Sequence, residues 1–155
     1  MNLDFMREAI ALSLENVRAG RGGPFAAVIV KDGKIIARGT NLVTSTNDPT
    51  AHAEIVAIRE ACRQIGHFHL TDCEIYTSCE PCPMCLAAIY WARLRKIYYA
   101  NTRSDAAAIG FDDELLYREI AMPHAQRAMP MEQIWLHDAQ EALRLWKTKD
   151  DKVPY

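Results

Sequence analysis

The sequence lacks long apolar runs, an excess of basic residues and a leader-like start. No apolar run approaches the roughly 20 residues that cross a bilayer, so we expect no membrane partner. The first residues, Met1–Asp4, carry an early acid instead of a basic and then an apolar region, which favours a cytoplasmic location. The formal net charge of −2 provides no long-range attraction to phosphate backbones and argues against nucleic acid as a partner.

Internal repeats, low-complexity stretches and interdomain linkers are also missing from the sequence. The chain has 155 residues, of which 50% are hydrophobic and 25% charged, and this is the balance of an ordinary soluble domain. A chain of this length can bury a substantial core. We therefore expect a single domain that spans residues 1–155.

The cysteines do not form a disulfide framework. Their number, five, is odd, and three of them fall within seven residues of one another. In a cytoplasmic chain such a cluster favours metal binding or redox chemistry. The cysteines are Cys62, Cys73, Cys79, Cys82 and Cys85.

Helical and strand patterns alternate along the chain. Four strands are expected at residues 25–30, 34–38, 74–77 and 96–100, and three clear helices at 4–19, 50–65 and 81–91. Weaker patterns predict short helices at 104–108 and 112–120, a last strand at 131–136 and a last helix at 139–147. Asp32-Gly33 between the first two strands predicts a β-hairpin. This order predicts an α/β fold with helices on both faces of a mixed sheet.

Two short motifs carry the chemistry. The first is His52-Ala53-Glu54 and the second is Pro81-Cys82-Pro83-Met84-Cys85. Either motif alone is common, but together they form the signature of zinc-dependent deaminases. One histidine and two cysteines provide three zinc ligands and leave the fourth tetrahedral position to water, as catalytic zinc sites do.

Glu54 is expected to carry protons and not to bind the metal. Zinc lowers the pKa of a coordinated water, Glu54 accepts its proton, and the carboxyl then protonates a ring nitrogen and the leaving amine. His52 and Glu54 are two residues apart and would not face together on a regular helix. Both can serve one metal if the helix begins between Thr50 and His52.

These motifs resemble the cytidine deaminase-like superfamily, and further stretches narrow the resemblance to its bacterial guanine deaminase branch. The first match covers 50–54 and 77–85, and the narrower one rests on 22–25, 47–50, 88–93, 110–113 and Tyr155. The resemblance implies a three-layer α/β/α fold with a five-stranded mixed sheet. It also implies conversion of guanine and water to xanthine and ammonia in purine metabolism.

The resemblance assigns the remaining site residues. His52, Cys82 and Cys85 would bind one zinc ion and Glu54 would shuttle protons. Asn41, Asp113 and Tyr155 would contact the purine, while Phe25 and Trp91 would line its pocket. The resemblance further implies a homodimer in which the C-terminal segment crosses to the partner, so that Asp113 and Tyr155 complete the neighbouring site.

Other functions use the same motifs. Guanosine, ammeline or cytosine would need the same zinc and the same Glu54, and a tRNA adenosine deaminase would add a basic surface for RNA. A non-catalytic zinc protein would not need Glu54 beside its ligands. A redox protein that used Cys82 and Cys85 would leave the His-x-Glu motif unexplained. The other cysteines, Cys62, Cys73 and Cys79, are interpreted as structural.

Overall fold

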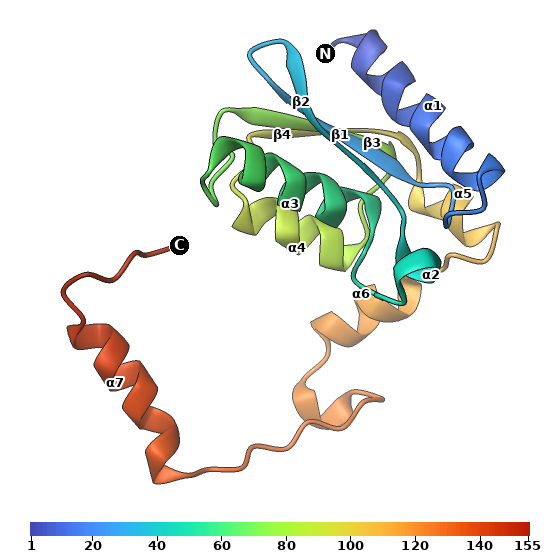
Figure 1. Ribbon diagram of the computed structural model, residues 1–155. Helices are drawn as coiled ribbons and strands as arrows, with labels where there is room; N and C mark the ends of the chain where they lie inside the picture. The colour runs from blue at the N-terminus through green and yellow to red at the C-terminus, as the bar shows by residue number, and fades with distance from the viewer. The chain divides into compact units, whose positions relative to one another are not determined.

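The computed structural model describes residues 1–155, which form two compact units, Met1–Glu114 and Leu115–Tyr155. The first unit contains one four-stranded sheet in the order β2-β1-β3-β4 (Figure 1). β1 is antiparallel to β2 and β3, whereas β3 and β4 are parallel, so the expected mixed sheet is confirmed. The strands are β1 (Ala26–Lys31), β2 (Lys34–Thr40), β3 (Cys73–Cys79) and β4 (Lys96–Asn101).

The expected count of five strands is wrong for this chain, because the sheet has four. Residues 131–136, predicted as the last strand, are irregular and belong to no ladder. A short apolar segment becomes a strand only when it pairs with an edge that satisfies its backbone groups. In this structure the segment has no such pairing.

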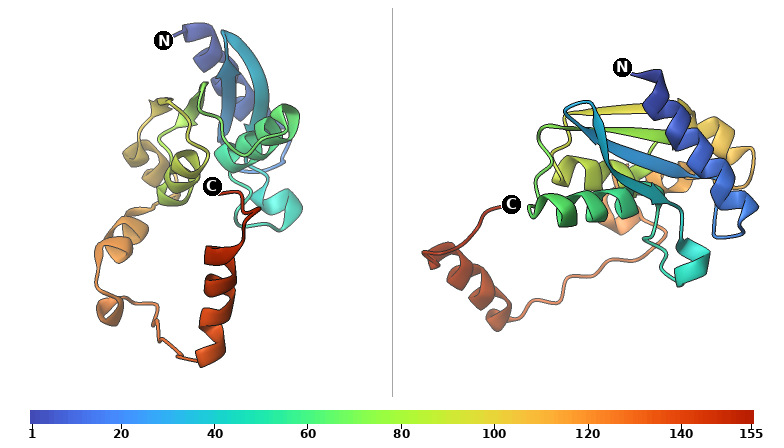
Figure 2. Two further views of the ribbon diagram at one scale, coloured as in Figure 1. Left: turned by 90° about the vertical axis from the view of Figure 1, so that its left-hand side faces the viewer. Right: turned by 45° about the horizontal axis from the view of Figure 1, so that its top comes forward.

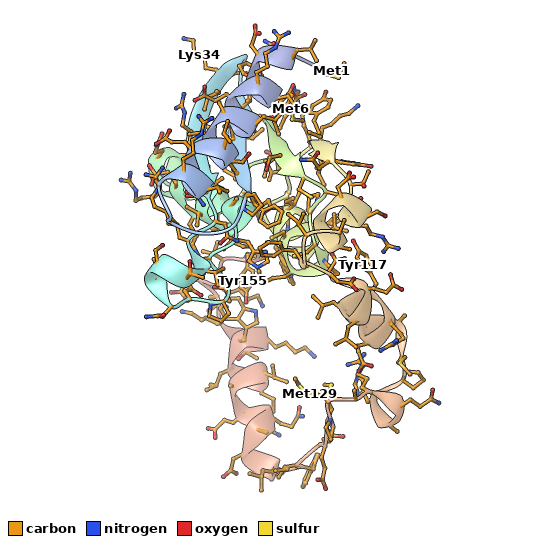
Figure 3. The ribbon with its side chains drawn as sticks, turned by 90° about the vertical axis from the view of Figure 1, so that its right-hand side faces the viewer. Met1, Met6, Lys34, Tyr117, Met129 and Tyr155 are labelled. Carbon is orange, nitrogen blue, oxygen red and sulfur yellow. The ribbon has the colours of Figure 1, made fainter.

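The β-hairpin is confirmed. Asp32 and Gly33 both have positive φ, 49° and 74°, as a type I′ turn requires, and Lys31 pairs with Lys34 across the turn. Figure 3 shows Lys34 and Met1 at the same end of the first unit. The turn of the hairpin therefore lies at the end of the first unit where α1 (Leu3–Arg18) begins.

Helices cover both faces of the sheet, as Figures 1 and 2 show, and the three-layer arrangement is confirmed. β1 is buried on both faces because its side chains alternate between two clusters. Val28 and Val30 pack with α1, whereas Ala27 and Ile29 pack on the side of α3 (Ala53–Ile65) and α4 (Pro83–Trp91). α3 and α4 lie side by side on that second face.

The remaining elements are short. The expected loop after β2 contains one helical turn, α2 (Val43–Thr46), and the helix predicted at 104–108 is α5 (Arg103–Ala107). α6 (Glu114–Ala121) leads into the second unit, which continues through two 3₁₀ turns, His124–Gln126 and His137–Gln140, to α7 (Glu141–Thr148). None of the helices has the length and apolarity that a membrane crossing requires.

Candidate active site

His52 is placed by a loop that is held together locally. Asp48 Oδ1 accepts hydrogen bonds from Thr50 N at 2.8 Å and Thr50 Oγ1 at 2.7 Å, and Arg59 lies 3.6 Å from the other carboxylate oxygen. The two bonds from Thr50, supported by Arg59, hold the pKa of Asp48 below its ordinary value. The loop ends at His52, the extended N-cap residue of α3. The expected helix start is therefore confirmed to within a residue.

Gly39 brings β2 close to the first turn of α3. A Cβ atom at Gly39 would collide with the backbone oxygen of Ala53 and the backbone nitrogen of Ala57. No residue larger than glycine fits between this strand and the helix start without a shift. The close approach fixes the helix start that carries His52 and Glu54 against the sheet.

The two cysteines are placed by the start of α4. Cys82 is its extended N-cap residue, Pro83 occupies the first helical position, and Cys85 lies one turn later and is fully buried. Proline suits this position because its missing N–H has no helical partner there. The partial positive charge at the helix N-terminus favours thiolates, the form that binds metals.

The three predicted ligands come together from these two helix starts. His52 Nδ1 lies 3.6 Å from Cys82 Sγ and 3.5 Å from Cys85 Sγ, and all three ligand atoms lie within 4.8 Å of one another. Tetrahedral zinc with ordinary Zn–S and Zn–N bonds separates sulfur and nitrogen by about 3.6 Å. The donor set and its spacing therefore fit one zinc ion.

The electrostatics of the ligand set favour a thiolate at Cys82. Its pKa is lowered to about 4, first by a hydrogen bond from the Cys85 thiol and then by His52. The same hydrogen bond raises the pKa of Cys85, whose thiol keeps the shared proton. Contact with Cys82 raises the pKa of His52. A bound cation would balance the negative charge of a Cys82 thiolate.

Glu54 lies beside the ligands in the first turn of α3. Its side chain is only 7% exposed, and burial raises the pKa of its carboxyl. The carboxyl also interacts with the Cys85 sulfur and with the charges of Cys82 and His52. A carboxyl in this position can hold a proton next to the metal and can also release it.

The zinc-binding region of cytidine and deoxycytidylate deaminases matches residues 1–101 of this chain. That match covers the hairpin, both helix starts and all three ligands. The chain belongs to this deaminase family. Its metal is zinc, and its residue types at positions 52, 54, 82 and 85 match the deaminase signature.

Individual relatives show to which members of the family this chain is similar along its length. Guanine deaminase from Bacillus subtilis is 52% identical over 97% of both chains, and its X-ray structure superposes with a TM-score of 0.97 over 100% of this chain and 99% of the other. The guanine deaminase from Nitrosomonas europaea is 37% identical, with a TM-score of 0.68 over 71% of this chain and 64% of the other. A tRNA-specific adenosine deaminase from Agrobacterium fabrum is 50% identical, but over only 56% of this chain and 57% of its own.

Asn41 and Phe25, two of the predicted purine contacts, are joined by backbone hydrogen bonding. Asn41 N donates to Phe25 O at 3.0 Å, and the Asn41 side chain is 6% exposed. The next residue, Leu42, donates its N–H to Ala51 O, directly before the ligand His52. The Phe25 ring meets the Phe111 ring edge-to-face, with centroids 4.9 Å apart. These backbone bonds link the segment that carries Asn41 and Phe25 to the loop that leads to His52.

Asp113 lies in the first unit and within electrostatic reach of the ligands. Burial raises the pKa of Asp113, and the negative charge of Cys82 raises it further. Trp91 is the last residue of α4 and is 66% exposed. Tyr155 ends the chain in the second unit and is 71% exposed.

Sequence reasoning did not single out three residues that shape this site. They are Phe111, which meets the Phe25 ring, Gly39, which brings β2 to the start of α3, and Asn16, a buried amide on α1. The signal at Asn16 is a polar residue on the inner face of α1, which is visible once the helix is drawn. The contacts of Phe111 and Gly39 are long-range and leave no local pattern.

Proposed function

We propose that this chain catalyses the zinc-dependent hydrolytic deamination of guanine to xanthine and ammonia. The observation that carries the proposal is the buried Glu54 carboxyl beside a set of three zinc ligands that leaves one position open. A purely structural zinc site would more often have four protein ligands and would not need a carboxyl there. Guanine follows from the 52% identity to a guanine deaminase over 97% of both chains.

In this mechanism His52, Cys82 and Cys85 hold the zinc, and Glu54 moves the protons. Bound zinc acts as a Lewis acid that lowers the pKa of a coordinated water toward neutrality. The Glu54 carboxylate accepts a proton from the attacking water and passes it to a ring nitrogen next to C2 of guanine. The carboxylate then takes the proton of the hydroxyl now bonded to C2 and passes it to the amine, so that the C2–N bond breaks, ammonia leaves and the oxygen stays on C2 as a carbonyl.

The purine would be held by hydrogen-bonding side chains and by aromatic rings. The Asp113 carboxylate suits the N–H donors of guanine at N1 and at the exocyclic amine, and the Asn41 amide suits its acceptors. Phe25 and Trp91 would line the pocket, where aromatic rings pack against a planar base. Tyr155 would add a hydroxyl from the C-terminal end.

The test is the loss of guanine absorbance together with ammonia release by the purified, zinc-loaded protein. Guanosine, adenine, cytosine and ammeline are run in parallel. We expect guanine to be turned over with the highest kcat/KM. Preference for another compound would keep the zinc chemistry and overturn the choice of guanine, and no turnover with one zinc per chain would overturn the proposed function.

A tRNA adenosine deaminase is the second candidate, because relatives of that class share the zinc motifs. The match to the Agrobacterium enzyme covers 86 residues, a little over half of each chain. The net charge of −2 and the acidic pair Asp112-Asp113 argue against an RNA-binding surface. A gel shift with tRNA across a range of salt concentrations tests whether the chain binds tRNA. We expect no shift near physiological salt.

We also propose a homodimer in which the chain acts as one domain with an exchanged C-terminal segment. β4 pairs only with β3, so its other edge carries unpaired backbone groups. Residues 131–136 include Ile134, Trp135 and Leu136, each more than 60% exposed. A segment of this kind from a second copy could add the fifth strand at β4.

Light scattering tests the dimer. We expect a mass of twice the 17.5 kDa chain for the native protein. Ile134→Pro removes a backbone donor in the added strand and should shift the protein toward the monomer, whereas Glu132→Gln should not. A monomeric native protein, or a dimer unaffected by Ile134→Pro, would overturn this exchange.

A cytoplasmic location is also proposed. All five cysteines are free, and zinc binding by Cys82 and Cys85 requires reduced sulfur. The reducing cytoplasm keeps thiols in that state. Cell fractionation tests the location, and recovery of the protein in a secreted or periplasmic fraction would contradict it.

A further inference from the structure

A buried amide, Asn16, stands out on the inner face of α1. Its side chain is 0% exposed, and its Nδ2 donates to two backbone carbonyls, Gly23 O at 3.0 Å and Asn41 O at 2.9 Å. Its Oδ1 is buried and has no hydrogen-bond partner. An orphaned buried acceptor is costly and needs a reason. An apolar side chain would avoid the unpaired oxygen but could not donate hydrogen bonds. The role of the amide therefore lies in its two donor bonds.

The two carbonyls that Asn16 binds belong to the backbone that carries Phe25 and Asn41. Gly23 O also accepts from Phe25 N at 2.8 Å, and Asn41 N donates to Phe25 O at 3.0 Å. The packing is close here, because a Cβ atom at Gly22 would collide with Asn41 O. Asn16 therefore ties the loop before β1 to the residue after β2.

The side chain of Asn41 is oriented by the same backbone. Its Oδ1 accepts hydrogen bonds from Gly23 N and Val43 N, both at 3.3 Å. The amide oxygen is used in this way, and the Nδ2 donors, which have no protein partner, are available to a ligand. A shift of Gly23 or of the Asn41 backbone would turn those donors away. The donors of Asn16 hold both in place.

We infer that Asn16 is a positioning residue for guanine recognition, acting through Asn41, and this inference rests on the proposed function. Asn16 touches neither the zinc ligands nor Glu54 in the hydrogen bonds of the structure. It fixes the position at which Asn41 presents its amide donors to an acceptor atom of the purine. Loss of Asn16 should therefore weaken the binding of guanine and leave the zinc chemistry in place.

A double-mutant cycle with Asn41 tests this role. Asn16→Asp keeps the volume and removes both donors, and we expect about a tenfold fall in kcat/KM for guanine, mostly through KM. Asn41→Ala should cause at least as large a fall. In the Asn41→Ala background, Asn16→Asp should have no further effect on kcat/KM. Asn16→Ser keeps one donor, folds more readily and should show an intermediate KM.

The control for a merely structural role is Ala9→Gly. Ala9 is also fully buried on α1, and its replacement should lower the melting temperature while KM stays unchanged. The zinc content should be that of the native protein in every variant. The side-chain amide signal of Asn41, identified by its loss in Asn41→Ala, should move in the ¹⁵N–¹H spectrum of the Asn16 variants.

The outcomes separate the two proposals. Additive effects of Asn16→Asp and Asn41→Ala on kcat/KM would overturn the role of Asn16 and leave the proposed function in place. A lower melting temperature of Asn16→Asp with unchanged KM would do the same. A zinc-loaded native protein that does not deaminate guanine would overturn the proposed function. Normal kcat/KM in Asn41→Ala would remove Asn41 from recognition, and with it the role of Asn16.

Discussion

The two units of this chain differ in what holds them together. Every buried side chain belongs to the first unit, which contains the sheet, the three zinc ligands and Glu54. In the second unit most of the large apolar side chains are exposed, among them Ile134, Trp135 and Leu143. The zinc ligands and Glu54 therefore lie on the unit that has a buried core, whereas the second unit has no core of its own. Such apolar surface favours the proposed cover by a second copy.

The largest expected effect comes from the core of the first unit. Glu54→Gln removes the proton carrier and keeps the shape, so we expect turnover to fall by about a thousandfold or more while zinc remains bound. Turnover is measured by ammonia release and zinc by metal analysis. Near-normal turnover would show that the chemistry does not depend on this carboxyl.

A matched control for that variant lies on the same helix. Glu60 is on the exposed side of α3 and pairs with Arg63 at 2.7 Å. Glu60→Gln should leave turnover and zinc content unchanged, because this pair is far along the helix from its start. An equal loss in both variants would point to damage to α3 as a whole.

A smaller effect is expected at the boundary of the two units. Asp113→Asn removes the negative charge proposed to accept the guanine N–H groups, and we expect a fall of about 10- to 100-fold in kcat/KM with kcat less affected. Asp112→Asn is the comparison, because Asp112 accepts a hydrogen bond from Glu114 N at the start of α6. That variant should affect stability more than KM. Equal KM values for the two variants would contradict the assignment of Asp113.

The second unit is tested directly at its last residue. Deletion of Tyr155, whose side chain is 71% exposed, should lower kcat/KM for guanine by several-fold and leave the melting temperature unchanged. Tyr155→Phe separates the hydroxyl from the ring, and its kcat/KM should lie between the native and deleted forms. Unchanged kinetics in both would mean that the second unit contributes no residue to the reaction.

The elements with strong local patterns were predictable from the sequence. The hairpin follows from Asp32-Gly33, and the end of α3 follows from Gly66, which has a φ of 70°. α2 was missed because Val43–Thr46 is made of β-branched residues and serine, which are poor helix formers. α5 was predicted at 104–108 and begins one residue earlier, because Thr102 is its N-cap and Asp105 completes the capping box.

The site was predictable where the chemistry requires fixed spacing. His52, Glu54, Cys82 and Cys85 follow from metal-ligand spacing and from the need for extended residues at two helix starts. Contacts between distant segments could not be predicted in the same way. Asn16 and Asn41 are 25 residues apart and meet only because α1 packs on the sheet. No spacing rule links these two residues.

The smallest expected effect concerns the loop that places His52, and it depends on pH. The pKa of Asp48 is lowered below its ordinary value of 3.8 in the folded chain, so its contribution to stability is present above that value and is lost as the pH falls through the lower, folded-state pKa. Asp48→Asn should therefore lower the melting temperature slightly at pH 7, and its melting curve should approach that of the native protein as the pH is lowered past 3.8. The effect is small because the pair with Arg59 is exposed and screened by salt. Asp72→Asn, an exposed aspartate before β3, is the control and should match the native protein at both pH values. A difference between Asp48→Asn and the native protein that persists well below that pH would mean that the amide disturbs the bonds from Thr50 and that charge is not the cause.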